Sequence, residues 1–340
     1  MFDNDEWLNQ VREEVVDPDR EIVDPHHHLW PKGNARGIVY DLEDLWRDTE
    51  DGHKVTQTIF MECGAAYRTD GPEHLKPVGE TEFVAAAAAR SAADAGKATI
   101  AALVAHADLR LPLAQLDEIL DAHIEAANGL FRGIRHSGPF DKAGQTFRIP
   151  PRAPEGLYRN EDFRRGVAHL GKRGLTYDTW NYHHQLRDLA DLAAAVPGTT
   201  MILDHFGTPL GVGPYEGKRE ENFEQWKDDI AAVAENPNLH AKIGGLAMPD
   251  NGFGWHERAT PPTSDEFVEA QAKYYYHTIK CFGPQRCMFE SNFPVDRLSI
   301  GYRVLWNGLK KIAADYSDEE QTAMFSDVAR KVYRVDPPAI

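Results

Sequence analysis

Cysteine and basic residues are scarce in this 340-residue sequence. Its three cysteines, Cys63, Cys281 and Cys287, are an odd and widely spaced set, which excludes a disulfide framework and favours a reducing compartment. No CxxC pair is present for zinc or redox chemistry. Lys and Arg number 37 against 54 Asp and Glu, which gives a net charge of −17. Such an acidic chain repels polyphosphates and anionic membranes, so we expect no nucleic-acid partner and no membrane partner.

Long apolar runs and targeting signals are also missing. No run approaches the ~20 apolar residues of a membrane helix, and residues 1–6 lack the positive and apolar segments of a secretory signal. The composition, 42% hydrophobic and 27% charged, is typical of a folded globular protein. We therefore expect a cytoplasmic protein that forms one domain over residues 1–340. The sequence leaves homo-oligomerisation open.

Short β-like runs alternate with amphipathic helical patterns along the chain. The predicted strands are residues 21–28, 55–63, 98–106, 130–136, 174–180, 199–206, 239–245 and 286–292. Helical patterns cover residues 81–95, 112–127, 162–172, 184–195, 220–235 and 264–281, and a final helix is predicted at 317–335. Alternation of this kind predicts an α/β fold with a parallel sheet. Eight repeats favour a (β/α)8 TIM barrel over about residues 21–335, with a C-terminal helix.

A doubly wound open sheet is the competing architecture. Such sheets usually carry GxGxxG after the first strand, whereas the first predicted strand here ends in histidines. Gly- and Pro-rich segments at 138–156, 207–217 and 249–262 follow predicted strands four, six and seven. In a barrel these long strand-to-helix loops would build the active face.

The end of the first predicted strand reads Asp-Pro-His-His-His. Side chains alternate across a strand, so His26 and His28 should face one side and His27 the other. Two imidazoles on one side can share a divalent metal. The alternative is a pair of core histidines bonded to backbone. His205 ends the sixth predicted strand, and with His26 and His28 it would give three nitrogens and leave metal positions open for water.

The eighth predicted strand offers a carboxylate. Glu290 and Asn292 have the same parity and should point inward, and Pro294 ends the strand. An inward carboxylate beside a metal or substrate is a candidate general base. The alternative is that Glu290 pairs with a core cation such as Lys242.

These motifs together resemble a known family. The HxH pair at His26 and His28, the LDHFG segment around His205, the SNFP turn at 291–294 and the FRGIRH segment at 131–136 are similar to the amidohydrolase superfamily. More narrowly, they resemble the amidohydrolase-related (amidohydrolase 2) branch, which contains 2-pyrone-4,6-dicarboxylate lactonase and sugar lactonases. The resemblance runs over residues 22–335.

The resemblance implies a TIM barrel that hydrolyses a cyclic ester. It carries over His26, His28 and His205 as metal-binding or carbonyl-polarising residues, and Arg135 as the binder of a carboxylate on an anionic lactone. It permits Zn²⁺ or Mn²⁺ without requiring either, since the branch has metal-independent members.

One departure from the family stands at the eighth strand. The family usually has aspartate where this chain has Asn292, and an amide cannot accept the proton of water. Glu290 or Asp296 must then act as the base, or Asn292 only orients water.

Several loop residues are further candidates for substrate contact. Each also has an ordinary structural reading, as a helix start, a packing residue or a solvated side chain. They are Glu62, His136, Trp180, Tyr182, His183 and Trp255.

The sequence thus predicts a lactone hydrolase with a His-rich, metal-permissive site. A metal-dependent non-oxidative decarboxylase of an aromatic or enol acid is the alternative within the same fold, although Asn292 argues against it. A catalytically silent, small-molecule-binding barrel is the alternative of another class.

Overall fold

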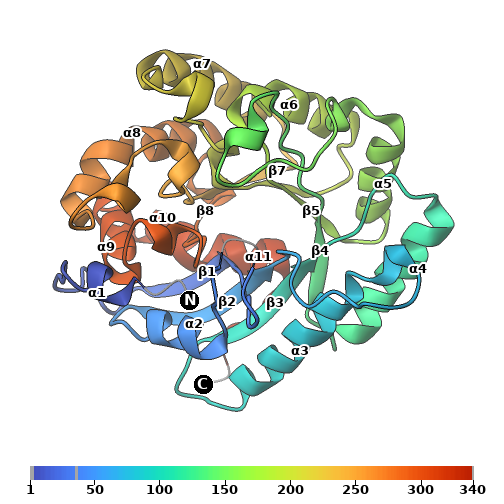
Figure 1. Cartoon of the computed structure of the whole chain (residues 1–340), viewed down its shortest axis with the longest axis horizontal. Coiled ribbons are helices and arrows are strands. Elements are labelled where there is room, and N and C mark those ends of the chain that lie inside the picture. The colour runs from blue at the N-terminus through green and yellow to red at the C-terminus, as the bar shows by residue number, and fades with distance from the viewer. Residues whose placement is uncertain (1–3, 35–36, 339–340) are drawn as a thin grey trace.

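Eight parallel strands form the centre of the computed structural model, which describes residues 4–34 and 37–338 (Figure 1). Each strand pairs with the next in chain order, and an isolated bridge from His27 to Phe293 joins the first strand to the segment after the last. The predicted (β/α)8 barrel is confirmed. The strands are β1 Glu21–His27, β2 Lys54–Met61, β3 Thr99–Ala105, β4 Phe131–Arg135, β5 Thr176–Thr179, β6 Met201–Leu203, β7 Leu239–Ile243 and β8 Cys287–Phe289.

Helices surround the barrel, as Figure 1 shows. They are α1 Asp5–Leu8, α2 Leu42–Thr49, α3 Val78–Ala92, α4 Leu113–Ala126, α5 Glu161–Lys172, α6 Leu186–Ala195, α7 Arg219–Ala234, α8 Ser264–Phe282 and α9 Tyr302–Ala313. Among the described helices, none combines the length and apolar character that a membrane crossing requires.

The sequence analysis missed α2 and α9. The α2 helix is short and depends on a reciprocal cap between Asp41 and Asp44. Within α9, Gly308 lowers the helix propensity. A side chain there would meet a ring atom of Phe267 in α8 at 2.3 Å, so the glycine allows the two helices to pack closely.

The C-terminal segment closes the N-terminal end of the barrel. The single helix predicted at 317–335 is instead α10 Asp318–Thr322, a π-helical turn at Ala323–Asp327 and α11 Val328–Tyr333. The segment starts with a capping box in which the side chains of Ser317 and Glu320 each accept a backbone hydrogen bond from the other residue. Residues of this segment pack with inward side chains of the strands in one apolar cluster. The C-terminal ends of the strands therefore remain as the side where a site can form.

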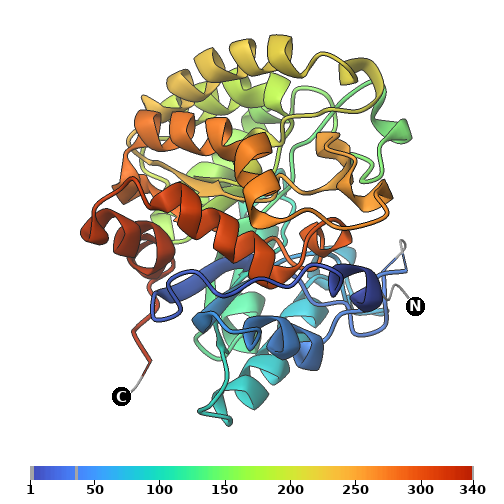
Figure 2. The same cartoon turned by 90° about the vertical axis from the view of Figure 1, so that its left-hand side faces the viewer.

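The N-terminal arm, residues 4–20, runs along α9 (Figure 2). Glu13 accepts hydrogen bonds from the Asn307 side chain at 3.0 Å and from the Ser264 backbone at 2.7 Å. Lys310 donates to the Asp17 carbonyl at 2.6 Å. These contacts fix the arm against two helices.

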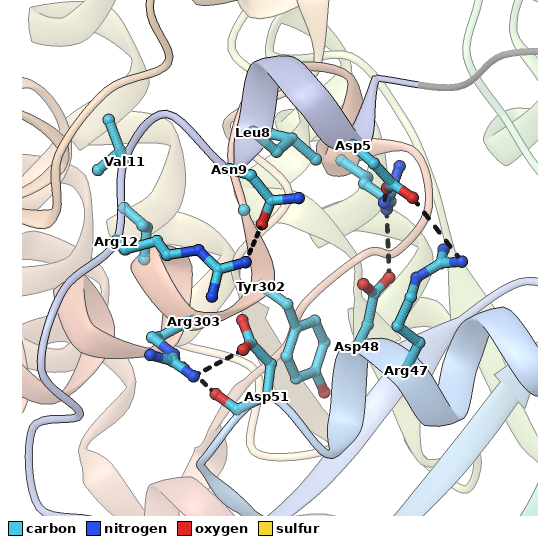
Figure 3. A pocket seen from close by; sticks show the side chains of 13 residues that line it. Asp5, Leu8, Asn9, Val11, Arg12, Arg47, Asp48, Asp51, Tyr302 and Arg303 are labelled. Atoms are coloured by element: carbon cyan, nitrogen blue, oxygen red, sulfur yellow. Dashed lines mark hydrogen bonds and ion pairs between the residues drawn. The ribbon is translucent and has the colours of Figure 1, made fainter.

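A pocket of about 230 Å³ lies where the N-terminal arm meets α2 and α9 (Figure 3). Two of its cations have acidic partners: Arg303 lies 2.7 Å from Asp51, and Arg297 pairs with Asp5 and lies 3.3 Å from Asp48. None of the described residues that line it is a histidine. The junction anchors Arg297, which directly follows Asp296 in the sequence.

Candidate active site

Three imidazoles meet at the C-terminal mouth of the barrel. The rings of His26 and His28 have centroids 4.9 Å apart, those of His26 and His205 lie 4.5 Å apart, and all three side chains are buried. His27 turns away and contacts Thr58, which agrees with the expected alternation. The convergence expected from the sequence is thus confirmed as geometry.

Oxygen atoms lie close to the Nδ1 atom of each ring. The two oxygens of Glu290 lie 2.9 Å from His26 Nδ1 and 2.6 Å from His205 Nδ1. His28 Nδ1 lies 2.8 Å from the Met61 carbonyl. Carboxylate and carbonyl oxygens accept hydrogen bonds, so the Nδ1 atoms of His28 and His205 carry hydrogen, and a neutral ring of this kind keeps its lone pair on Nε2. His26 Nδ1 also lies 3.5 Å from Lys242 Nζ. Burial, together with the nearby cations, lowers the pKa of His26 and of His28 and so favours the neutral form.

Asp24 fixes the backbone that carries His26. Its Oδ1 accepts hydrogen bonds from the backbone of Ser291 at 3.0 Å and of His26 at 3.3 Å, and its Oδ2 accepts one from the Tyr302 hydroxyl at 3.1 Å. Burial raises the pKa of Asp24 to about 6. The carboxyl therefore ties β1 to the segment after β8 beside the histidines.

The absence of a side chain at Gly245 leaves room for the His205 ring. The glycine has φ +71°, and a side chain on it would stand 2.3 Å from His205 Nδ1. We expect Gly245→Ala to displace the ring and lower kcat/KM by ~10-fold, because small misplacements of reacting groups cost rate. Gly254→Ala is the matched control, since Gly254 has φ +68° with nothing within 4 Å of the added atom. Both variants carry a strain of about 1–2 kcal/mol, so equal kinetic losses in the two would contradict the expected role of this space.

Arg135 ends β4 and is already occupied. Its Nε lies 2.9 Å from Glu62 Oε1, its Nη1 lies 3.2 Å from His26 Nε2 and 3.3 Å from Asp204 Oδ2, and its Nη2 donates to the Glu62 carbonyl. Guanidinium has five N–H donors, so a single one is left without a partner among the described residues. The geometry does not favour the bidentate carboxylate binding that we expected for Arg135.

Sequence reasoning missed a buried ion network at the base of the site. Lys242 Nζ lies 2.8 Å from Asp178 and 3.1 Å from Asp204, and Tyr333 donates to Asp178. Burial opposes the charge of Lys242, but the three carboxylates Asp178, Asp204 and Glu290 outweigh it and raise its pKa. The sequence motifs did not single out Asp178 or Asp204, although Asp204 directly precedes His205.

The side chains of Asn292 and Asp296 form a hydrogen-bonded pair after β8. Strand β8 ends at Phe289 and Asn292 has φ +55°, so strand alternation does not extend to Asn292, and its side chain turns to Asp296. Asp296 Oδ1 accepts from the Asn292 amide at 2.8 Å, and Oδ2 accepts from the Ala247 backbone at 3.0 Å. Burial raises the pKa of Asp296 to about 7 although His205, Asn292 and Ala247 oppose the shift.

Contacts within the loops around the barrel mouth hold the three aromatic candidates, Trp180, Tyr182 and Trp255. Trp180 donates to Thr208 at 2.9 Å, and Tyr182 donates to the Ile149 carbonyl at 3.2 Å. Trp255 is buried against two phenylalanines. These contacts give each side chain a structural role, and substrate contact stays a prediction for them.

The two loop histidines are held in the same way. His136 Nδ1 accepts from the Leu109 backbone at 3.1 Å, and His183 Nδ1 accepts from the Leu210 backbone at 3.2 Å. Burial lowers the pKa of His136 to about 3 and that of His183 to about 4, so both rings are neutral.

The donor set fits a divalent metal. His26 Nε2 and His28 Nε2 are 3.3 Å apart, and two nitrogens that bind one tetrahedral Zn²⁺ at ~2.1 Å are about 3.4 Å apart. Among the described residues, His26, Asp204 and His205 have ligand atoms that all lie within 4.8 Å of one another. The held Nδ1 atoms supply the outer contacts that orient such ligands. Arg135 Nη1 competes for the His26 lone pair.

Comparisons with known proteins agree with this site. A family model described as amidohydrolase matches residues 23–335. The Sinorhizobium fredii protein y4mH is 32% identical over 334 residues, which cover 92% of this chain and 98% of that protein. An L-fucono-1,5-lactonase from Burkholderia multivorans is 25% identical over 245 residues, covering 72% and 74% respectively.

A crystal structure of a Burkholderia multivorans amidohydrolase with bound zinc has the same fold. Its TM-score is 0.71 at 23% identity, and the match covers 93% of this chain and 99% of that one. With almost the whole barrel inside the family match, the chain belongs to the amidohydrolase family and is a hydrolase of that superfamily.

Proposed function

We propose that the chain hydrolyses a small, neutral, hydroxylated lactone. The observation that carries this proposal is the meeting of three imidazole rings at one mouth, with the buried carboxyl of Asp296 near His205. Ester hydrolysis requires an electrophilic contact for the carbonyl and a base for water. Relatives named L-fucono-1,5-lactonase, 25% and 23% identical, support this reaction class.

Asp296 is our candidate for the proton acceptor. Glu290 already faces two imidazole nitrogens, at 2.9 Å and 2.6 Å, and Asp204 pairs with two cations. No cation of the described residues forms an ion pair with Asp296, and its pKa of about 7 suits a base at neutral pH. Asn292 orients this carboxyl through its amide.

The reaction then follows from these placements. Water loses a proton to Asp296 as its oxygen bonds to the lactone carbonyl carbon. The ring C–O bond breaks, and Asp296 returns the proton to the leaving alkoxide, which yields a hydroxy acid. The remaining donor of Arg135 can stabilise the carbonyl oxygen. A divalent ion held by His26, His205 and Asp204 would polarise the carbonyl and lower the pKa of water.

The charges around the site favour a neutral substrate over the anionic lactone that we expected. Carboxylates outnumber cations, and the one free donor of the guanidinium cannot form a bidentate pair. Glu62 has acceptor capacity for substrate hydroxyls. The charged groups counted are Glu62, Asp178, Asp204 and Glu290 against Arg135 and Lys242.

A lactone panel read by acid release tests the proposal. We expect neutral sugar lactones to be hydrolysed with kcat/KM at least ~10-fold above that for 2-pyrone-4,6-dicarboxylate, because two substrate charges would face an excess of carboxylates. Preference for the dicarboxylate would contradict the neutral-substrate proposal. Release of CO₂ from aromatic acids would favour the decarboxylase alternative, and no turnover of any compound would favour the silent barrel.

A further inference from the structure

Lys242 lies at the closed end of the site and is completely buried. Its Nζ is 2.8 Å from Asp178 Oδ1 and 3.1 Å from Asp204 Oδ1. The Met61 sulfur at 3.9 Å and the ring of Tyr333, with its centroid at 5.3 Å, cover other sides. An ammonium in such a place persists because paired carboxylates and an aromatic face stabilise it.

The two carboxylates around Lys242 converge as the ligands of a divalent cation do. Asp178 lies in β5, and Asp204 directly follows the neighbouring strand β6. Each directs its Oδ1 to the same point, which the ammonium occupies. Carboxylate oxygens are the ligands that Mg²⁺ and Mn²⁺ prefer, and Zn²⁺ accepts them too.

Asp204 links this point to the histidines. Its Oδ1 faces Lys242, while its Oδ2 lies 3.3 Å from Arg135 Nη1. Asp204 also belongs to the group with His26 and His205 that can hold a metal. The Lys242 ammonium and a bound ion would therefore share one carboxylate, and both would carry positive charge into a site rich in carboxylates.

We propose that the Lys242 ammonium is a built-in cation of this site. It takes the place between Asp178 and Asp204 that a second divalent ion would otherwise fill, so the native chain binds at most one divalent ion, on the Nε2 side of the histidines. The inference concerns cation occupancy and does not depend on the substrate.

Metal stoichiometry of the purified chain and of two variants tests this proposal. Lys242→Ala removes the charge and opens space, whereas Lys242→Met removes the charge but fills the space. After dialysis against Mn²⁺, we expect Lys242→Ala to hold one more ion per chain than the native protein, and its Tm to rise with added Mn²⁺. Lys242→Met should gain no ion and show no such rise. Adding Asp178→Asn to Lys242→Ala should remove the extra ion.

Two results would overturn the proposal. One is two bound ions per native chain. The other is a folded Lys242→Ala variant that holds no more Mn²⁺ than the native protein. If Lys242→Ala does not fold alone, it is refolded with Mn²⁺: recovery with one extra ion supports the proposal, and failure to recover contradicts it.

Discussion

Asp296→Asn is expected to lower kcat by ~10²–10⁴-fold, which is the usual contribution of a positioned general base. The amide cannot accept a proton from water, while the histidines and Arg135 remain in place. Steady-state kinetics on the best lactone of the panel measure the loss, and thermal unfolding shows whether the variant is folded.

The pH profile separates this chemical role from a structural one. Burial raises the pKa of Asp296 to about 7, and the ionised form is the base. In the native protein, kcat/KM should therefore fall as the pH drops through about 7 and level off above it. This acidic limb should be missing from the residual activity of Asp296→Asn. A variant that keeps both the rate and the limb would contradict the assignment of Asp296.

Glu290→Gln is expected to lower kcat by ~100-fold, the upper end of what outer partners of catalytic ligands contribute. The native carboxylate lies 2.9 Å from His26 Nδ1 and 2.6 Å from His205 Nδ1. Glutamine offers one oxygen and one NH₂ group, so one of the two rings must change its tautomer or turn.

Metal binding provides an independent readout for the same variant. Where the native chain binds Zn²⁺, its affinity should weaken by ~10–100-fold in Glu290→Gln. If Glu290 were instead the general base, its replacement would lower the rate without changing the metal affinity. Unchanged affinity together with a large loss of kcat would therefore favour Glu290 as the base, as one reading of the sequence holds.

The barrel could be predicted from sequence because its signal is local and repeated. Each strand is a short apolar run, and eight of them alternate with helical patterns. The pairing of His26 with His28 follows from alternation within one strand. The helices α2 and α9 were not predicted. Helix α2 depends on a local cap, and α9 contains a glycine whose role becomes visible only in its packing against Phe267.

The partners of the charged residues could not be predicted. Whether Arg135 is free for a substrate depends on Glu62 and Asp204, which lie on two other elements. The network of Lys242 joins residues of β5, β7 and the segment after β6, so it requires the register of the whole barrel. A single sequence shows which residues are present, but it does not show which side chains come into contact.

The protonation pattern of His28 and His205 is the central claim, and ¹⁵N NMR of the imidazole nitrogens tests it most directly. Signals are assigned with single His→Gln variants, because the chain has 15 histidines. We predict hydrogen on Nδ1 and an unprotonated Nε2 in His28 and His205 at pH above about 7, with or without a divalent ion, because the Met61 carbonyl and Glu290 accept the Nδ1 hydrogens. A hydrogen on Nε2 of His28 or His205 in the native protein would contradict the account.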